Sequence, residues 1–327
     1  MKNKKNIGLL AVAAITVLSV LACSWYSAEP GPVVIPTTPG HYFTISAAGV
    51  IQGLSALGVD AELTELNIPP IINGVLVTSI GDNAFGNFDP EQVVSPLSAV
   101  TIPDGVHTIG SWAFGNNQLS SITIPDSIHT IRFGAFAFNR LQSVTIPNGV
   151  NTIEFNTFGN NELTEVDIPD SVYTIGDSAF ANNLLTEVII PGNVRTIERA
   201  AFQNNNLDKV IIPGNVQTIG VVAFAANGLS EVTIHEGVQT IEMQAFVNNS
   251  LTEVTIPRSV QTIGGQAFAA GWNITSVTFY GNPEFNAGVF AVGESLLDAI
   301  ETTDSLRPAT FTRTGTGMSG TWERQQP

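Results

Sequence analysis

The side chains best suited to bind a metal ion are the four histidines, and two of them share a spacing. His107 and His129 stand 22 residues apart, so in a chain that repeats with this period their imidazoles would lie on neighbouring layers. Two imidazoles would supply half of a tetrahedral zinc site. No carboxylate follows in this column, which continues with Asn151, Tyr173, Arg195, Gln217, Gln239 and Gln261. The column is therefore typical of a solvated polar row, and we expect neither a metal nor another cofactor, with a two-histidine site as the alternative.

Motifs that would indicate catalysis are missing from the sequence. It contains no G-x-S-x-G, H-E-x-x-H or P-loop motif, no cysteine–histidine pairing, and no D-x-D spacing of the kind that calcium loops use. The acidic residues are spread along the chain rather than gathered as an acid–base pair. We therefore expect a protein that is not an enzyme.

The charge balance excludes two classes of partner. Twelve lysines and arginines oppose 28 acidic residues, which gives a formal net charge of −16. An acidic surface repels nucleic acid and anionic lipid headgroups. We expect no nucleic-acid partner, and membrane contact only through an N-terminal anchor.

The N-terminus predicts export and such an anchor. MKNKK is followed by the apolar run IGLLAVAAITVLSVLA, which is typical of a signal peptide. The run ends at Cys23, the single cysteine of the chain, and Val20-Leu21-Ala22-Cys23 resembles the bacterial lipobox, in which the cysteine thiol carries a diacylglyceryl group. We expect a signal peptide at 1–22, and a lipidated cysteine with a Pro-rich tether at 23–40. An ordinary secretory signal with an incidental cysteine is the alternative.

A strict 22-residue repeat organises the rest of the chain and predicts a solenoid. Its marker is an isoleucine that ends the pattern L-x-x-V-x-I, found at Ile102, Ile124, Ile146, Ile168, Ile190, Ile212, Ile234 and Ile256. The alternating pattern predicts a short half-buried strand, which the following proline ends in most copies. A second apolar set and an A-F pair complete each coil. We predict a β-rich solenoid of nine or ten coils of 22 residues.

Both ends of the solenoid need caps, because an open coil exposes apolar edges. We expect an N-terminal β cap at 41–67 and repeats at 68–280. A degenerate last repeat with a C-terminal β-hairpin cap is expected at 281–327.

An asparagine recurs in the turn of seven successive coils. A stacked asparagine carries both a donor and an acceptor for backbone groups that a turn leaves unpaired, so we interpret the row as structural rather than as a binding row. Its members are Asn117, Asn139, Asn161, Asn183, Asn205, Asn227 and Asn249.

Candidate binding residues are those that depart from the rule of their column. On the outward side of the strands, Ile189 and Ile211 stand where other coils have mostly Thr, and Lys209 interrupts a row that includes Glu187 and Glu231. Two stacked exposed isoleucines beside a lysine would form a small hot spot. The alternative is that isoleucine only serves the strand as threonine would. Arg195 is a further basic candidate near this stretch.

A second candidate surface lies just before the A-F pairs, where Trp112, Phe133 and Phe155 occupy positions expected to be polar. Exposed aromatic side chains favour protein partners or self-association. The alternative is that these rings tuck between coils.

The pattern LTEVTIPxSVxTIGxxAFxNN resembles the Treponema-type, or BspA-like, leucine-rich repeat of bacterial surface lipoproteins, over about residues 41–327. The repeats are one residue shorter than the family's usual repeat, and asparagine stands where a cysteine is common. The resemblance implies a right-handed leucine-rich-repeat arc on the cell envelope, at the outer membrane or cell surface. It also implies an adhesin that binds host matrix proteins or other cells. A structural or self-associating envelope protein without a host ligand is the alternative, and the oligomeric state stays open.

Overall fold

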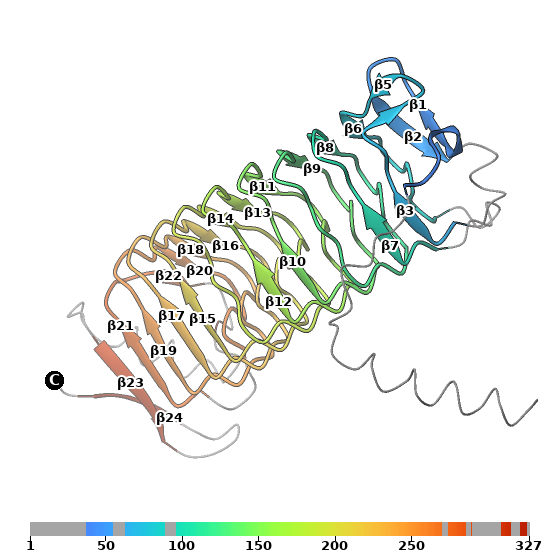
Figure 1. Ribbon diagram of the computed structural model, residues 1–327. Helices are drawn as coiled ribbons and strands as arrows, with labels where there is room; N and C mark the ends of the chain where they lie inside the picture. The colour runs from blue at the N-terminus through green and yellow to red at the C-terminus, as the bar shows by residue number, and fades with distance from the viewer. Residues whose placement is uncertain are drawn as a thin grey trace, which may run out of the picture. The chain divides into compact units, whose positions relative to one another are not determined.

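The computed structural model describes residues 37–54, 63–88, 96–269, 274–285, 289, 309–314 and 321–325 (Figure 1). The predicted signal peptide, Cys23 and most of the predicted tether lie outside these residues. Within them the chain forms short β-strands and one 3-10 turn, η1 (Gly40–Tyr42). The described residues include no helix that is long and apolar enough to cross a membrane. The predicted β-rich solenoid is confirmed, with about eight turns of about 22 residues.

One ladder of strands, which we call the strand face, comes from the L-x-x-V-x-I segments. In Figure 1 these strands follow one another along the solenoid. Parallel pairing places each residue opposite its equivalent one repeat later, as in Lys209 with Glu231. The central valines and terminal isoleucines are mostly buried, while the residues between them face water. The strands are β3 (Glu65–Asn67), β7 (Ala99–Thr101), β10 (Ser143–Thr145), β12 (Glu165–Asp167), β15 (Lys209–Ile212), β17 (Glu231–Ile234), β19 (Glu253–Ile256) and β21 (Ser276–Phe279).

A second ladder comes from the Thr-Ile pairs, and it forms the longest sheet. Its strands are two residues long, with the isoleucine buried and the threonine half-buried. Seven of them join in the order β11-β13-β14-β16-β18-β20-β22. The strands of this ladder are β6 (Ser79–Ile80), β8 (Thr108–Ile109), β9 (Thr130–Ile131), β11 (Thr152–Ile153), β13 (Thr174–Ile175), β14 (Thr196–Ile197), β16 (Thr218–Ile219), β18 (Thr240–Ile241), β20 (Thr262–Ile263) and β22 (Glu284–Phe285).

Between the ladders, phenylalanine rings form a continuous stack through the core. Neighbouring rings are nearly parallel, with centroids between 5.3 and 5.7 Å apart. The stack consists of Phe114, Phe136, Phe158, Phe180, Phe202, Phe224, Phe246 and Phe268. Phe85 extends it by stacking on Phe114 at 5.4 Å, and β22 adds an irregular coil at the other end. These flanking coils account for the prediction of nine or ten.

Antiparallel strands lie at both ends of the parallel ladders. At the N-terminal end, β1 (Phe43–Ile45) pairs with β2 (Val50–Leu54), and β2 pairs with β6. The hairpin of β4 (Ile71–Ile72) and β5 (Val75–Leu76) lies in the same region. At the C-terminal end, β21 pairs with β23 (Ala309–Thr314), and β23 pairs with β24 (Thr321–Arg324). Pairing an edge strand removes a template for aggregation. Residues 55–62 of the predicted N-terminal cap and most of the predicted C-terminal segment at 281–327 lie outside the described residues.

Candidate protein-binding site

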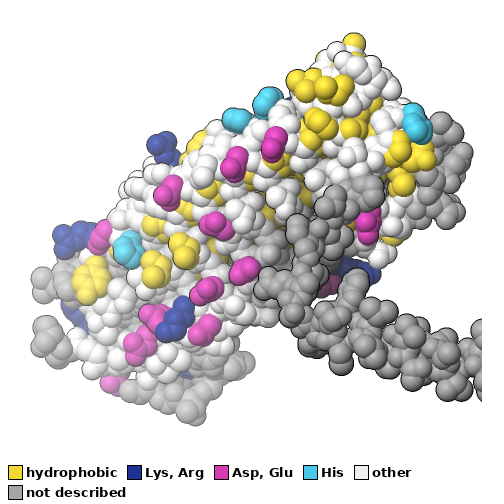
Figure 2. Space-filling model, viewed as in Figure 1, with side chains coloured by type: hydrophobic (Ala, Val, Ile, Leu, Met, Phe, Trp, Pro, Cys, Tyr) yellow, Lys and Arg dark blue, Asp and Glu magenta, His cyan; other side chains and the backbone are white. Residues whose placement is uncertain are grey.

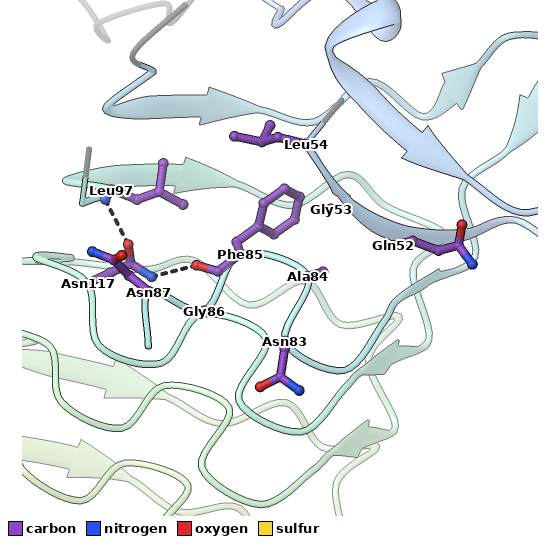
Figure 3. A pocket seen from close by; sticks show the side chains of 10 residues that line it. All are labelled: Gln52, Gly53, Leu54, Asn83, Ala84, Phe85, Gly86, Asn87, Leu97 and Asn117. Atoms are coloured by element: carbon purple, nitrogen blue, oxygen red, sulfur yellow. Dashed lines mark hydrogen bonds between the residues drawn. The ribbon is translucent and has the colours of Figure 1, made fainter. Parts of the chain in front are cut away.

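The repeated asparagines lie inside the solenoid. Figure 3 shows the first of them beside the hollow between Leu54 and Phe85. The Asn117 amide donates to the carbonyl of Phe85 at 2.8 Å, and its Oδ1 accepts from the backbone N–H of Leu97 at 2.8 Å. Six of the seven are buried, and Asn227 is half-buried with equivalent bonds. An amide used in this way is not available to an external ligand.

The two histidines of the shared column lie close together on the surface. Their ring centroids are 5.8 Å apart, and the Nδ1 atoms of both rings are within hydrogen-bond distance of the Ser127 carbonyl. A carbonyl only accepts, so these bonds require a proton on each Nδ1. The described residues contain no group of three or more histidine, cysteine, aspartate or glutamate side chains that would hold a metal ion. Within the described residues, the two imidazoles therefore have no third histidine, cysteine or carboxylate beside them that would complete a metal site.

The isoleucine and lysine candidates gather on the strand face. We define the strand-face patch as Glu187, Ile189, Lys209, Ile211 and Glu231. Ile189 is 83% exposed and Ile211 is 59% exposed, so the two side chains present apolar surface to water one coil apart. In the next coil, Thr233 lies opposite Ile211 in the parallel register. The patch therefore offers apolar surface at positions that other coils fill with polar side chains.

An ion pair borders the exposed isoleucines. The Nζ of Lys209 lies 2.9 Å from Oε2 of Glu231. The hydrogen bond to Glu231, followed by the attraction of its charge, raises the pKa of Lys209 above its ordinary value, and desolvation opposes the rise. Both side chains are more than half exposed, so the pair adds little stability. The ion pair therefore keeps the positive charge of Lys209 beside the acidic side chains of its column.

The strand ladder is interrupted at the patch, as it also is at residues 121–124 and between β17 and β19. Residues 187–190 form no strand, although β12 and β15 occupy the equivalent positions in the coils on either side. Within the described residues, no hydrogen bond joins the N–H groups of 187–190 to a neighbouring coil. Isoleucine and valine favour strands, so the sequence carries no signal for this interruption. The most exposed isoleucine thus lies where the ladder is open.

Arg195 lies apart from the strand-face patch. Its exposed side chain lines a polar hollow in the turns after the prolines, together with Asp170, Tyr173, Asn193 and Gln217. Its backbone N–H donates to the carbonyl of Tyr173 at 2.9 Å. The structure therefore does not join Arg195 to the isoleucines that precede it in the sequence.

The aromatic candidates form a larger group than the sequence predicted. The aromatic cluster consists of Phe88, Trp112, Phe133, Phe138 and Phe155. The Trp112 ring lies 5.1 Å from Phe88, 6.2 Å from Phe133 and 6.5 Å from Phe138 between centroids. The phenylalanines are 42–48% exposed, and Trp112 is half-buried. The phenylalanines thus present surface to water, while Trp112 packs among them.

Two members of this cluster are not singled out individually by the sequence. Phe138 stands in a turn column that has asparagine at 116, 160, 182 and 204, and this departure from the column could have identified it. Phe88 lies in the insertion at 87–98, which as a whole is a possible contact because loops on solenoids often carry specificity, but no column singles out Phe88 within it. Acidic side chains are spread over the face seen in Figure 2, with fewer basic ones among them.

Comparison with known proteins gives one family and several structural relatives. The family model described as "BspA type Leucine rich repeat region" matches residues 60–186 and 173–297, with six copies. A leucine-rich cell surface protein from Faecalibacterium prausnitzii is 24% identical at a TM-score of 0.47, covering 81% of this chain and 82% of its own. The pneumococcal vaccine antigen PcpA is 20% identical at a TM-score of 0.45, with 73% and 78% covered. A leucine-rich repeat protein from Bacteroides ovatus is 20% identical at 0.45, with 78% of each chain covered. No curated protein matches the sequence.

Proposed function

This chain belongs to the BspA-type leucine-rich repeat family, and from that premise we propose that it is a lipid-anchored cell-surface protein without enzymatic activity. Its proposed role is adhesion, by binding proteins of a host matrix or of other cells. The proposed partner-binding region is the strand-face patch. The observation that carries this proposal is the 83% exposure of Ile189 beside the exposed Ile211.

Exposed isoleucines favour a protein partner on energetic grounds. Fully burying an isoleucine side chain contributes about 1.5–3 kcal/mol. The two isoleucines therefore offer a free-energy gain that threonine in the same column would not provide. The Lys209–Glu231 pair at the edge would contribute mainly to selectivity and association rate.

The proposed anchor is the acylated Cys23. A diacylglyceryl group places two acyl chains in the bilayer, and two chains hold a protein stably where a single chain binds only marginally. Metabolic labelling with radioactive palmitate tests this part. We expect label on the wild type and none on Cys23→Ala, and label retained by that variant would contradict the anchor.

The adhesion proposal is tested with the full-length chain, purified in mild detergent. The probes are immobilised matrix proteins and whole co-resident bacteria, and the variants are wild type, Ile189→Thr/Ile211→Thr and the same-column control Thr123→Ala. We expect the double variant to bind at least about tenfold more weakly, which corresponds to about 1.4 kcal/mol, and the control to bind as wild type does.

Two other results would count against adhesion through this patch. If the folded double variant binds as strongly as wild type, the strand-face patch is not the binding site. Failure to bind any probe, together with concentration-dependent association in sedimentation velocity, would favour the alternative of a self-associating envelope protein.

A further inference from the structure

We propose that Trp112, Phe133 and Phe155 of the aromatic cluster, together with Glu154 and Glu198, form a second binding site that accepts an arginine side chain presented by a partner protein. The inference deepens the proposed function, and it rests on that proposal only for the premise that the chain binds proteins. The residues involved are distinct from the strand-face patch, so the two sites are separable by experiment.

A shallow hollow brings the aromatic and acidic groups together. Trp112, Phe133 and Phe155 line it, as do Glu154 and Glu198. The three aromatic residues come from successive coils at the start of the turn before each A-F pair. Rings and carboxylates thus face one open space on the solenoid surface.

Backbone hydrogen bonds fix the aromatic wall of the hollow. The N–H of Trp112 donates to the carbonyl of Phe133 at 3.0 Å, and the N–H of Gly134 donates to the carbonyl of Phe155 at 2.8 Å. These bonds join the three coils at the positions that carry the rings. The wall is therefore held before any ligand arrives, which lowers the entropic cost of binding.

The two carboxylates are also held in place. Oε2 of Glu154 accepts from the backbone N–H of Phe133 at 2.9 Å, and Oε2 of Glu198 accepts from the backbone N–H of Asp177 at 3.0 Å. Within the described residues, neither Oε1 atom accepts a hydrogen bond, and neither glutamate forms an ion pair. Each carboxylate therefore keeps an oxygen that can accept a hydrogen bond from a ligand.

The rings of Trp112 and Phe138 stand at turn positions that are left-handed throughout the repeat. Both residues have a φ of 57°. The same columns are left-handed in other coils, as at Val222 with a φ of 51° and Asn160 with a φ of 57°. The turn geometry of the repeat therefore sets where these two rings are placed.

The residue opposite Trp112 is matched to the indole. Gly134 has a φ of 63°, and a Cβ atom added there would lie 2.4 Å from the Trp112 ring. Only glycine lets the indole lie against this backbone. The sequence thus combines an aromatic residue at one coil with the absence of a side chain at the next.

Arginine is the ligand that fits both kinds of group. Its planar guanidinium stacks on aromatic faces and donates several hydrogen bonds to carboxylates. A neutral apolar ligand would desolvate Glu154 and Glu198 without a partner for their charges, which is unfavourable. The cations nearest in sequence, Arg132 and Arg199, are exposed and do not line the hollow. The hollow is therefore available to an arginine from another protein.

The test measures peptide binding to the full-length chain in mild detergent, at about 150 mM salt so that long-range attraction is screened. The probe is fluorescein-labelled Gly-Arg-Gly-Arg-Gly, and its neutral counterpart contains citrulline in place of arginine. Fluorescence anisotropy gives the affinity. We expect the citrulline peptide to bind at least about tenfold more weakly, and Phe133→Ala/Phe155→Ala to weaken the arginine peptide by about tenfold. Glu154→Gln/Glu198→Gln should weaken it similarly.

Matched controls come from the same repeat positions in a distant coil. Met243 occupies the column of Phe155 and is 50% exposed, while Oε2 of Glu242 accepts from Val221 as Glu154 does from Phe133. Met243→Ala and Glu242→Gln should leave peptide binding unchanged, as should Ile189→Thr/Ile211→Thr. Unchanged arginine-peptide binding by the folded aromatic variant, or equal binding of the citrulline peptide, would overturn the site. Loss of peptide binding in the Glu242→Gln control would do the same, because it would indicate general attraction to an acidic surface.

These outcomes separate the two proposals. Peptide binding that depends on Phe133 and Phe155, without capture of any matrix protein or cell, would support the arginine site and contradict adhesion through the strand face. Capture that depends on Ile189 and Ile211, without peptide binding, would do the reverse.

Discussion

At the residue scale, the repeated asparagines show how a solenoid satisfies its interior backbone groups. The Asn183 amide donates to the carbonyls of Phe158 and Phe180 at 3.0 and 3.1 Å, and its Oδ1 accepts from Leu163 N–H at 3.0 Å. One side chain thus connects its own coil to the preceding one. An aspartate would lack the donors, and a leucine would leave the carbonyls and the N–H without partners.

Replacing one asparagine of this row should therefore be costly. We predict that Asn183→Ala lowers the free energy of unfolding by about 3 kcal/mol, because it leaves several buried backbone groups without a hydrogen bond. Urea unfolding followed by circular dichroism measures the change. Asn206→Ala, an exposed position nearby, should change it by less than about 0.5 kcal/mol. Similar values for the two variants would contradict the structural interpretation.

The packing of Trp112 against Gly134 can also be tested at the residue scale. We predict that Gly134→Ala displaces the Trp112 ring and costs about 1–3 kcal/mol, because the added methyl overlaps the indole and the φ is positive. The Trp fluorescence spectrum and urea unfolding report the two effects. The control is Gly192→Ala, where an added Cβ meets nothing within 4 Å. A Gly134→Ala variant with the stability and emission of wild type would contradict the packing described for Trp112.

A glutamate in the turns gives a prediction about pH. Glu236 accepts from the backbone N–H groups of Arg258 and Ser259, both at 3.0 Å, and the bond from Arg258 is the main cause that lowers the pKa of Glu236 below its ordinary value of 4.5. A carboxyl with a lowered folded-state pKa stabilises the fold above its ordinary pKa, and this contribution is lost as the pH falls through the folded value. Because the group is exposed, the contribution is at most about 0.5 kcal/mol.

We therefore expect Glu236→Gln to be slightly less stable than wild type at pH 7, with a difference that disappears as the pH falls below 4.5. Urea unfolding over this range measures it. Glu253→Gln is the control, since its carboxylate accepts no backbone hydrogen bond in the described part of the chain. A stability difference that grows toward low pH would contradict a lowered folded-state pKa for Glu236.

At the element scale, the regular strands could be predicted from the sequence because each column repeats one physical requirement. Alternating valine and isoleucine bury one side of each strand, and the A-F pair supplies the ring stack, so the register follows from the spacing alone. Ile189 shows the limit. Its residue type and column predict a strand, yet residues 187–190 form none, because hydrogen-bond geometry between coils is not encoded in any single column.

This interruption predicts a local difference in backbone protection. We expect the amides of residues 187–190 to exchange with deuterium at least about tenfold faster than those of β15, because they lack partners that the β15 amides have in their pairing with β17. Hydrogen exchange with mass spectrometry resolves the two segments. Equal protection in both would contradict an open ladder at Ile189.

The aromatic cluster shows a different limit of sequence reasoning at this scale. Trp112, Phe133 and Phe155 could be identified because they break the polar rule of their positions. The contact of Phe88 with Trp112 has no sequence spacing that would single it out, because Phe88 lies where the 22-residue register is broken. Gly134 stands one repeat after Trp112 in the same column, but the fit of the indole against its backbone depends on how the two coils stack.

At the scale of the whole molecule, each coil contacts mainly its neighbours, so a surface substitution in one coil leaves distant coils unchanged. A surface substitution can therefore change binding without changing the fold. The most regular columns bury side chains or satisfy backbone groups, and each proposed site is centred on residues that depart from their column, Ile189 and Ile211 in one and Trp112, Phe133 and Phe155 in the other. The net charge of −16 also favours a partner with a basic surface over one with an acidic surface.

The most direct test of adhesion through the strand-face patch measures binding and stability on the same preparation of Ile189→Thr/Ile211→Thr. Biolayer interferometry against the captured matrix protein or cell gives the affinity, and urea unfolding gives the stability. We predict that affinity falls at least about tenfold, while the free energy of unfolding changes by less than about 0.5 kcal/mol. Unchanged affinity, or a loss of affinity that comes with a comparable loss of stability, would contradict the claim that these departures from the repeat carry the binding function.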